Sequence, residues 1–241
     1  MSPERPRRVR LADTHALTSR VRALLFEAEG PEPFAYEAGQ WVMLRPRGPD
    51  GAALARPYSV ASAPGHAGPN HFEVAVGAST DPIVEALWGL RVGQGLEVGD
   101  AGGALTWRSA RGRGATLLVG AGTGVAPLRA LAQEALAREG PPVVLLAGYR
   151  APDDVLWGDE LSAWGRRPGG RARFEVTLSR APESWAGRRG YVQEHVVELA
   201  RALEPADAFV CGRSAMAASV AELLRREGGL PESAVHVEGH G

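Results

Sequence analysis

A glycine-rich turn in the middle of the chain limits its fold more than any other feature. Gly120-Ala121-Gly122-Thr123-Gly124 follows an apolar run at 115–119 and precedes a helix expected at 127–138. A strand, a glycine turn and a helix in this order direct free backbone N–H groups and the positive end of a helix dipole at one point, which suits a pyrophosphate. The third glycine of the usual dinucleotide fingerprint is replaced by Val125, whereas Pro127 stands where we expect the helix to start. A tight turn without a ligand therefore stays an alternative.

The turn begins at residue 120 of 241, so another unit precedes the nucleotide-binding fold that it predicts. The first half reads as short strands, near 21–26, 41–44, 58–62, 71–76 and 96–98. Asp81 and Pro82 are a good N-cap and first residue for its one expected helix. Short strands at this spacing predict an antiparallel β-barrel.

The second half alternates apolar strands with helical segments, which predicts an α/β domain with a parallel sheet. The polar, Arg- and Gly-rich stretch at 108–114 predicts the join. We therefore expect two domains, residues 1–110 as the barrel and residues 111–241 as the nucleotide-binding unit.

Composition excludes several classes of protein. The net charge of −1 gives no support to nucleic-acid binding. The single cysteine, Cys211, excludes an intramolecular disulfide and a four-cysteine iron–sulfur cluster within the chain, and no metal site is predicted. No run of about 18 apolar residues predicts membrane insertion, and the N-terminus lacks the apolar core of a secretory signal, so we expect a cytoplasmic protein. The sequence leaves the oligomeric state open.

Arginine supplies all 27 basic residues, so any one arginine is a weaker sign of selected chemistry. Four arginines near the N-terminus predict a solvated tail or, as the alternative, a docking surface for an acidic partner: Arg5, Arg7, Arg8 and Arg10.

A second informative segment is Arg56-Pro57-Tyr58-Ser59. We expect Arg56, Tyr58 and Ser59 to share one face of a strand, where a guanidinium, an aromatic ring and a hydroxyl could meet a flavin. The alternative is that Tyr58 is simply a core aromatic of the barrel.

In order along the chain, these segments resemble the ferredoxin–NADP reductase family, whose members have an FAD-binding barrel followed by a pyridine-nucleotide domain. Arg56-x-Tyr58-Ser59 is similar to the family's R-x-Y-[ST] flavin motif, and Gly122-Thr123-Gly124-x-x-Pro127 is similar to its nucleotide turn. Further similar segments are Gly39-Gln40-Trp41-Val42, Gly148-Tyr149-Arg150, Asp159-Glu160-Leu161, and Cys211-Gly212 with Met216.

For the flavin, the resemblance implies that Arg56 pairs with the FAD pyrophosphate, that Tyr58 packs on the isoalloxazine ring and that Ser59 hydrogen-bonds flavin N5. The cofactor-binding residues expected in the barrel are Arg56, Pro57, Tyr58, Ser59, Val74, Val76 and Thr80. The family's G-x-x-[ST] phosphate motif is replaced by Ser79-Thr80-Asp81-Pro82-Ile83. Asp81 would repel a pyrophosphate unless it caps the helix, so FMN stays an alternative to FAD.

For the nicotinamide, the resemblance implies that Cys211 lies beside the reacting carbon, with Gly212 and Met216 nearby. Near the C-terminus, Glu238 takes the place of an acidic residue of the family and His240 that of an aromatic residue over the flavin; the alternative is a frayed tail. The catalytic residues expected are Ser59, Cys211 and Glu238. The expected nucleotide-binding residues are Gly122, Thr123, Gly124, Pro127, Ser179, Arg180, Tyr191, Gln193, Cys211, Gly212, Met216 and His240.

The choice between NADPH and NADH stays open. Leu178-Ser179-Arg180 followed by Tyr191-Val192-Gln193 resembles the pattern of NADP-using relatives, in which Ser and Arg bind the 2′-phosphate and Tyr stacks on adenine. Arg188 and Arg189 could add positive charge. However, Trp185–Val192 also resembles a segment of NADH-using relatives, and a solvated loop is the third reading.

The function that follows is hydride transfer from NADPH or NADH to FAD, and then electron transfer to a separate acceptor such as a ferredoxin, a flavodoxin or an oxygenase component. The alternative is a non-catalytic flavin- or nucleotide-binding regulatory subunit of a larger redox complex. A direct nicotinamide dehydrogenase without flavin would leave the Arg56–Ser59 segment unexplained.

Overall fold

The structure is a computed structural model that describes residues 6–48, 51–107, 114–138, 142–166 and 171–240. It contains two six-stranded sheets, one antiparallel and one parallel. The expected domain boundary between residues 110 and 111, and most of the predicted join, lie outside the described residues.

The antiparallel sheet contains β1 (Arg7–Thr18), β2 (Val21–Ala28), β3 (Trp41–Arg45), β4 (Arg56–Ser59), β5 (His71–Gly77) and β6 (Gly95–Gly102). Its strand order is β4-β3-β6-β1-β2-β5. A bridge between Val60 and Val74 joins the two ends of this order and closes the barrel. Fully buried Phe26 and Phe72, whose ring centroids are 5.5 Å apart, lie in its core. The predicted antiparallel barrel is confirmed.

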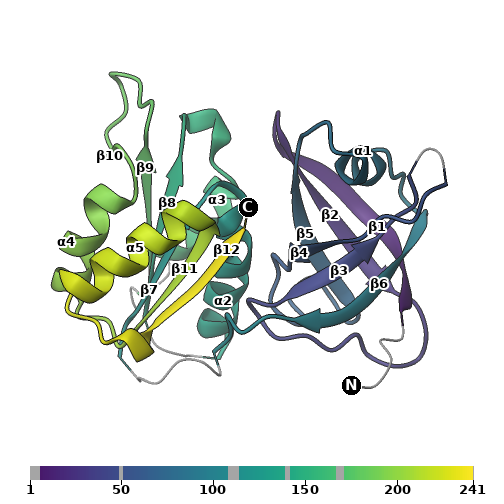
Figure 1. Ribbon diagram of the computed structural model, residues 1–241, viewed down its shortest axis with the longest axis horizontal. Coiled ribbons are helices and arrows are strands. Elements are labelled where there is room, and N and C mark those ends of the chain that lie inside the picture. The colour runs from purple at the N-terminus through teal and green to yellow at the C-terminus, as the bar shows by residue number, and fades with distance from the viewer. Residues whose placement is uncertain (1–5, 49–50, 108–113, 139–141, 167–170, 241) are drawn as a thin grey trace.

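Helix α1 (Pro82–Trp88) begins as its sequence predicts. Asp81 is the N-cap, and its Oδ1 accepts a 3.1 Å hydrogen bond from the Ile83 amide. The helix buries Ile83, Val84 and Leu87 and lies against the barrel (Figure 1).

The N-terminal arginines correct one expectation. Arg7, Arg8 and Arg10 lie within β1, not in a solvated tail, and Arg5 lies outside the described residues. Arg7 donates to the carbonyl oxygen of Pro33 at 2.8 Å, and Arg10 pairs with Glu27. The sequence did not predict this strand because its arginines suggested an exposed segment, although the alternate residues Val9 and Leu11 are fully buried.

The parallel sheet contains β7 (Thr116–Ala121), β8 (Val143–Tyr149), β9 (Ala172–Leu178), β10 (Arg188–Arg189), β11 (Asp207–Arg213) and β12 (Val235–His240), in the order β10-β9-β8-β7-β11-β12. Four helices cover its two faces. α2 (Val125–Ala137) and α3 (Gly158–Gly165) pack on one face, and α4 (Gln193–Leu203) and α5 (Ser214–Arg226) on the other. Short 3₁₀ turns lie at Gly122–Gly124, Pro152–Asp154 and Glu232–Ala234. The predicted parallel α/β fold is confirmed.

Helix α2 lies between the two sheets (Figure 1). All of Val125–Gln133 is buried, because one face packs on the parallel sheet and the other meets the barrel residues Ala38, Ala61 and Leu105. A helix that is apolar nearly all round needs cover on both sides. Among the described residues, no helix has the length and apolar character needed to cross a membrane.

Candidate functional site

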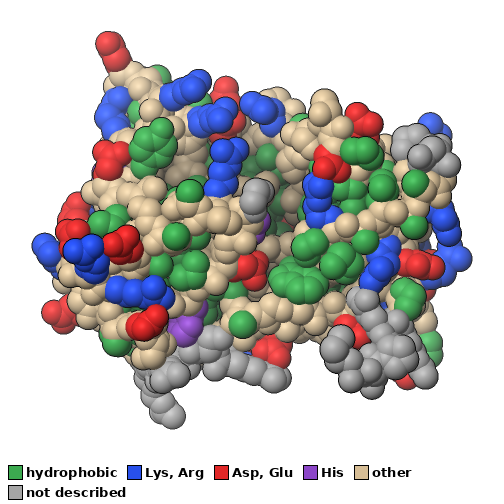
Figure 2. All heavy atoms as spheres, viewed as in Figure 1, with side chains coloured by type: hydrophobic (Ala, Val, Ile, Leu, Met, Phe, Trp, Pro, Cys, Tyr) green, Lys and Arg blue, Asp and Glu red, His purple; other side chains and the backbone are tan. Residues whose placement is uncertain are grey.

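A cavity of about 400 Å³ opens between the barrel and the parallel sheet. Figure 2 shows the surface hollowed between the two halves on the viewed face. Seven predicted site residues line the cavity: Arg56, Pro57, Tyr58, Ser59, Thr123, Glu238 and His240. The fold therefore brings together side chains that are up to 184 positions apart in the sequence (56 to 240).

Strand β4 forms one wall of the cavity, but its lining side chains do not follow the alternation of a regular strand. Arg56 and Tyr58 alternate, whereas Ser59 directly follows Tyr58, so strict alternation would point Ser59 to the other side. All four residues of β4 reach the cavity because the strand is a short edge strand that ends at Ser59. The expectation that three side chains share one strand face was wrong in its geometry, although all three line one cavity.

Tyr58 fits both interpretations made from the sequence, a residue of the ligand site and a core aromatic of the barrel. Its ring packs against the barrel core and also lines the cavity. Burial raises the pKa of its hydroxyl, and the positive charge of Arg56 opposes that shift. The hydroxyl is buried, and Arg56 is the charged group that acts on it.

Arg56 forms an ion pair with Asp81, the N-cap of α1. The guanidinium lowers the pKa of the Asp81 carboxyl, with help from the Ile83 amide. Asp81 thus caps the helix and also holds the arginine expected to bind a pyrophosphate. An anionic ligand at Arg56 would have to compete with this carboxylate.

Three predicted barrel residues do not line the cavity with their side chains. Val74 and Val76 are fully buried in the barrel core, because Ala75 and Gly77 occupy the opposite positions of β5 and line the cavity instead. Thr80 is exposed, and its neighbour Ser79 is the lining residue.

The opposite wall comes from the end of β12, whereas Cys211 at the end of the neighbouring strand β11 is fully buried and does not line the cavity. Cys211 pairs in register with Glu238, and His240 follows two residues later on β12. The Ser59 hydroxyl donates to Oε1 of Glu238 at 3.3 Å, which links the barrel to the parallel sheet. The sulfur of Cys211 lies 3.8 Å from Nε2 of His240. His240 is therefore part of a strand rather than of a frayed tail.

Burial governs the protonation of this wall. It raises the pKa of Cys211 well above its ordinary value, and the negative charge of Glu238 adds to that rise. Burial also raises the pKa of Glu238, against the hydrogen bond from Ser59, and lowers the pKa of His240. Because the thiol is the favoured form of Cys211, a thiolate nucleophile is not expected here.

The glycine turn holds two glycines for different reasons. Gly122 has φ of +56°, and nothing lies within 4 Å of the position that a Cβ would take, so its outer side is open. A Cβ on Gly124 would lie 2.5 Å from the carbonyl oxygen of Cys211, so this glycine lets α2 approach β11. The helix begins at Val125, two residues before the expected start, and Pro127 lies in its first turn, where its missing N–H costs nothing.

Met216 of α5 packs on Gly212 of β11, where a Cβ would lie 2.3 Å from the Met216 Cε.

The expected 2′-phosphate site lies at the end of β9. The Ser179 and Arg180 amides donate to the carbonyl oxygens of Tyr149 and Arg150 at 3.0 and 2.8 Å, which anchors this turn on β8. Arg180 is exposed, and its guanidinium makes no ion pair or hydrogen bond with another described residue. Tyr191 is 66% exposed.

The other candidate residues beside this turn are occupied or buried. Arg188 pairs with Glu175 and Glu198. The guanidinium of Arg189 donates to four backbone carbonyls of its own loop, those of Ala181, Pro182, Glu183 and Trp185. Gln193 begins α4, and its side-chain amide oxygen Oε1 is buried without a hydrogen-bond partner among the described residues.

Comparison with known proteins fits this geometry. Residues 118–222 match the model of the oxidoreductase NAD-binding domain. The chain is 40% identical to ferredoxin–NADP reductase B of Sorangium cellulosum over 245 aligned positions, covering 97% of both proteins. The chain belongs to the ferredoxin–NADP reductase family. The resemblance seen in the sequence is confirmed, and with it the assignment as an FAD-dependent NAD(P)H reductase.

Two further proteins are similar to this chain. The chain is 29% identical to the ferredoxin reductase component of the 3-ketosteroid-9-alpha-monooxygenase of Rhodococcus rhodochrous, covering 92% of this chain and 61% of that protein. The crystal structure of a cytochrome P450 reductase from Amycolatopsis superposes with a TM-score of 0.82 at 26% identity, over 98% of this chain and 70% of that one.

The described residues fit the cofactors of the family. The cavity has an arginine, a tyrosine and a hydroxyl on the barrel side and the glycine turn on the other. Gly122 leaves the outer side of the turn free for a phosphate.

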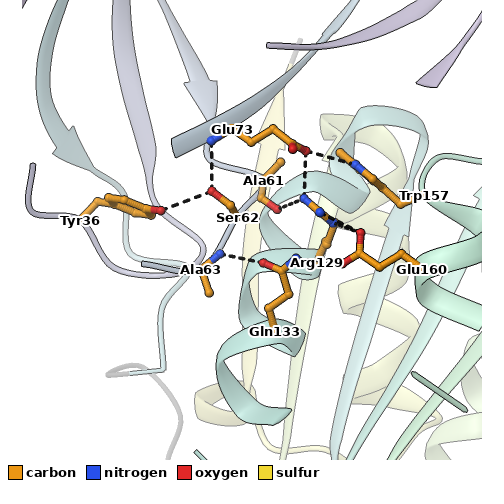
Figure 3. Close-up of polar contacts among 9 residues, drawn as sticks. All are labelled: Tyr36, Ala61, Ser62, Ala63, Glu73, Arg129, Gln133, Trp157 and Glu160. Carbon is orange, nitrogen blue, oxygen red and sulfur yellow. Dashed lines mark hydrogen bonds and ion pairs between the residues drawn. The ribbon is translucent and has the colours of Figure 1, made fainter. Parts of the chain in front are cut away.

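One residue that joins the two halves of the molecule was missed by sequence reasoning. Arg129 of α2 is only 5% exposed and donates to the carbonyl oxygen of Ala61 at 2.7 Å and to Glu73 at 2.9 Å, both in the barrel. It also binds Glu160 at 2.8 Å and lies 4.7 Å from the ring centroid of Trp157 (Figure 3). The general abundance of arginine hid it. The similarity of Asp159-Glu160-Leu161 to the family was the available signal.

Proposed function

We propose that this chain oxidises NADPH, holds the hydride acceptor FAD against β4, and delivers electrons to a separate ferredoxin-type protein. The observation that carries the proposal is the shared cavity, because residues of the flavin motif and of the nucleotide domain line one space. The names of the relatives support a protein acceptor, since one is a ferredoxin–NADP reductase and another the reductase component of an oxygenase.

Bound FAD supplies a hydride acceptor that can return electrons one at a time. On the barrel side, Arg56 offers a guanidinium to the pyrophosphate, Tyr58 an aromatic face to the ring, and Ser59 a hydroxyl at the position proposed for N5. The hydrogen bond from Ser59 to Glu238 sets the direction of that hydroxyl.

On the nucleotide side, the turn at Gly122–Gly124 offers backbone N–H groups to the second pyrophosphate. Glu238 forms part of the wall against which the nicotinamide would lie, and the buried Cys211 is its register partner on β11. Because the Cys211 thiol is favoured by burial, its part is to shape the wall and not to attack the substrate. His240 extends this wall as a half-buried imidazole.

The preference for NADPH over NADH rests on Arg180. Its guanidinium is exposed and uncommitted among the described residues, whereas Arg188 and Arg189 are held by carboxylates and carbonyls. A 2′-phosphate would give Arg180 a charge-assisted partner, and Tyr191 offers an exposed ring for adenine.

The experiment is an anaerobic titration of the FAD-loaded protein with NADPH and then NADH, followed by ferredoxin, flavodoxin or the oxygenase component as acceptor. We expect NADPH to bleach the flavin absorbance at a higher kcat/KM than NADH, and ferredoxin to restore it. Flavin that binds but resists both nucleotides would favour the regulatory-subunit alternative. Faster reoxidation by flavodoxin than by ferredoxin would overturn the proposed acceptor.

A further inference from the structure

Three side chains of different ligand chemistry meet where β11 and β12 end. Cys211 and Glu238 are register partners on adjacent parallel strands, and Glu238 and His240 are two positions apart on one strand, which places them on the same face. One thiol sulfur, one carboxylate oxygen and one imidazole nitrogen lie within 4.8 Å of one another. Sequence spacing did not reveal this group because 26 residues separate Cys211 from Glu238.

The separations suit a tetrahedral metal ion. Zinc binds sulfur at about 2.3 Å and imidazole nitrogen at about 2.0 Å, so two such ligands at a tetrahedral angle stand about 3.5 Å apart. The observed distance from Sγ of Cys211 to Nε2 of His240 is 3.8 Å. A shift of a few tenths of an ångström would complete that pair.

The surroundings suit a cation as well. Glu238 makes no ion pair with another described residue, and its carboxylate is oriented by the Ser59 hydroxyl at 3.3 Å, as the ligands of metal sites usually are. Glu238 and His240 line the cavity, which provides an entry path and an open fourth position.

We propose that Cys211, Glu238 and His240 form a site for a divalent transition metal ion, best suited to Zn²⁺, and that the bound ion blocks reduction of the enzyme by nicotinamide nucleotides. Binding forms Zn–S, Zn–N and Zn–O bonds and releases the thiol proton of Cys211 to solvent, with no change of oxidation state. The ion would occupy the wall proposed for the nicotinamide. This inhibition rests on the proposed function, whereas the binding of the metal does not.

The test titrates the FAD-loaded protein with Zn²⁺ against a chromophoric chelator and records the zinc K-edge X-ray absorption of the one-to-one complex. We expect one tight site with a sulfur ligand at about 2.3 Å. His240→Ala should weaken binding at least about tenfold, since the half-buried end of β12 loses one of three protein ligands. His15→Ala, which removes an exposed imidazole in β1, is the matched control and should bind zinc as the unchanged protein does.

Cys211→Ser should also weaken binding and remove the sulfur signal. If this buried substitution prevents folding, the His240 variant decides the question alone. Equal zinc affinity in His240→Ala and the unchanged protein, or a complex without sulfur, would overturn the site. Zinc bound through sulfur with an unchanged rate of flavin reduction by NADPH would overturn the proposed inhibition. A protein that binds zinc as expected but is reduced by neither nucleotide would sustain the metal site and remove the proposed function.

Discussion

The Arg129 guanidinium donates a 2.7 Å hydrogen bond to the carbonyl oxygen of Ala61. Arg129 lies on the helix that follows the nucleotide turn, and Ala61 lies two residues beyond Ser59 in the barrel. The same guanidinium nitrogen donates to Glu73 of β5 at 2.9 Å (Figure 3). These two contacts join α2 directly to the barrel. They hold the two walls of the cavity in a fixed position relative to each other.

Arg129→Met should destabilise the protein by about 3–5 kcal/mol, because it leaves the carboxylates of Glu73 and Glu160 without their buried partner. Urea unfolding monitored by tryptophan fluorescence measures the change. Arg138→Met, which removes a 74% exposed arginine paired with Glu134, is the control and should cost less than about 1 kcal/mol. Equal effects of the two substitutions would contradict the structural role of Arg129.

Asp81→Asn should tighten FAD binding about two- to fivefold. The asparagine keeps the cap of α1, since Asn and Asp are similar N-caps, while Arg56 loses its competing carboxylate. Fluorescence titration of the apoprotein with FAD gives the dissociation constant. Glu85→Gln removes an equal charge from the same helix without touching Arg56 and should leave the affinity unchanged. Weaker FAD binding by Asp81→Asn would show that Arg56 needs Asp81 to hold its position.

Gly122→Ala and Gly124→Ala should separate ligand binding from folding. At Gly122 the added methyl group meets open space, so we expect about 1 kcal/mol of backbone strain from the positive φ and a clear loss of NADPH affinity. At Gly124 the methyl group meets the Cys211 carbonyl, and the loss of stability should reach about 3 kcal/mol. Thermal unfolding and nucleotide titration of both variants test this, and the reverse order of stability would contradict the packing described.

Arg180→Ala should raise the KM for NADPH tenfold or more, on the scale of a charge-assisted hydrogen bond of about 1.5–3 kcal/mol, and leave the KM for NADH unchanged. Steady-state kinetics with both nucleotides measure the effect. Arg225→Ala, an exposed arginine of α5, controls for the loss of one positive charge. If both KM values change alike, Arg180 does not recognise the 2′-phosphate.

Glu238→Gln should change how stability depends on pH. Burial raises the pKa of Glu238 in the folded protein above its ordinary value, so between those two values the folded state binds more protons than the unfolded state. Stability contributed by this group is therefore present at low pH and is lost as pH rises through that window. The neutral glutamine removes this loss, so the variant should gain stability relative to the unchanged protein as pH rises from below the ordinary carboxyl pKa to above the raised one. Urea unfolding below and above that window tests the sign, with exposed Glu232→Gln as the control.

Much of the site was predictable because its parts are local. The cap at Asp81, the strand at Arg56–Ser59 and the turn at Gly122–Gly124 depend on neighbours in the sequence, and each lies where its pattern predicts. The errors have local causes too. Charged residues concealed β1, and the resemblance led us to expect Val74 and Val76 at the flavin, although β5 presents Ala75 and Gly77 to the cavity.

The sequence by itself determined the order of a barrel and a nucleotide-binding sheet, because hydrophobic periodicity and turn residues act over a few positions. Only the tertiary structure decided which side chains share the cavity. The pairing of Arg56 with Asp81, the contact of Ser59 with Glu238, and the burial of Arg129 against Ala61 join residues that are 25, 179 and 68 positions apart. The first contact depends on how α1 packs on the barrel and the other two on how the two sheets pack through α2, and no local pattern of residues encodes that packing.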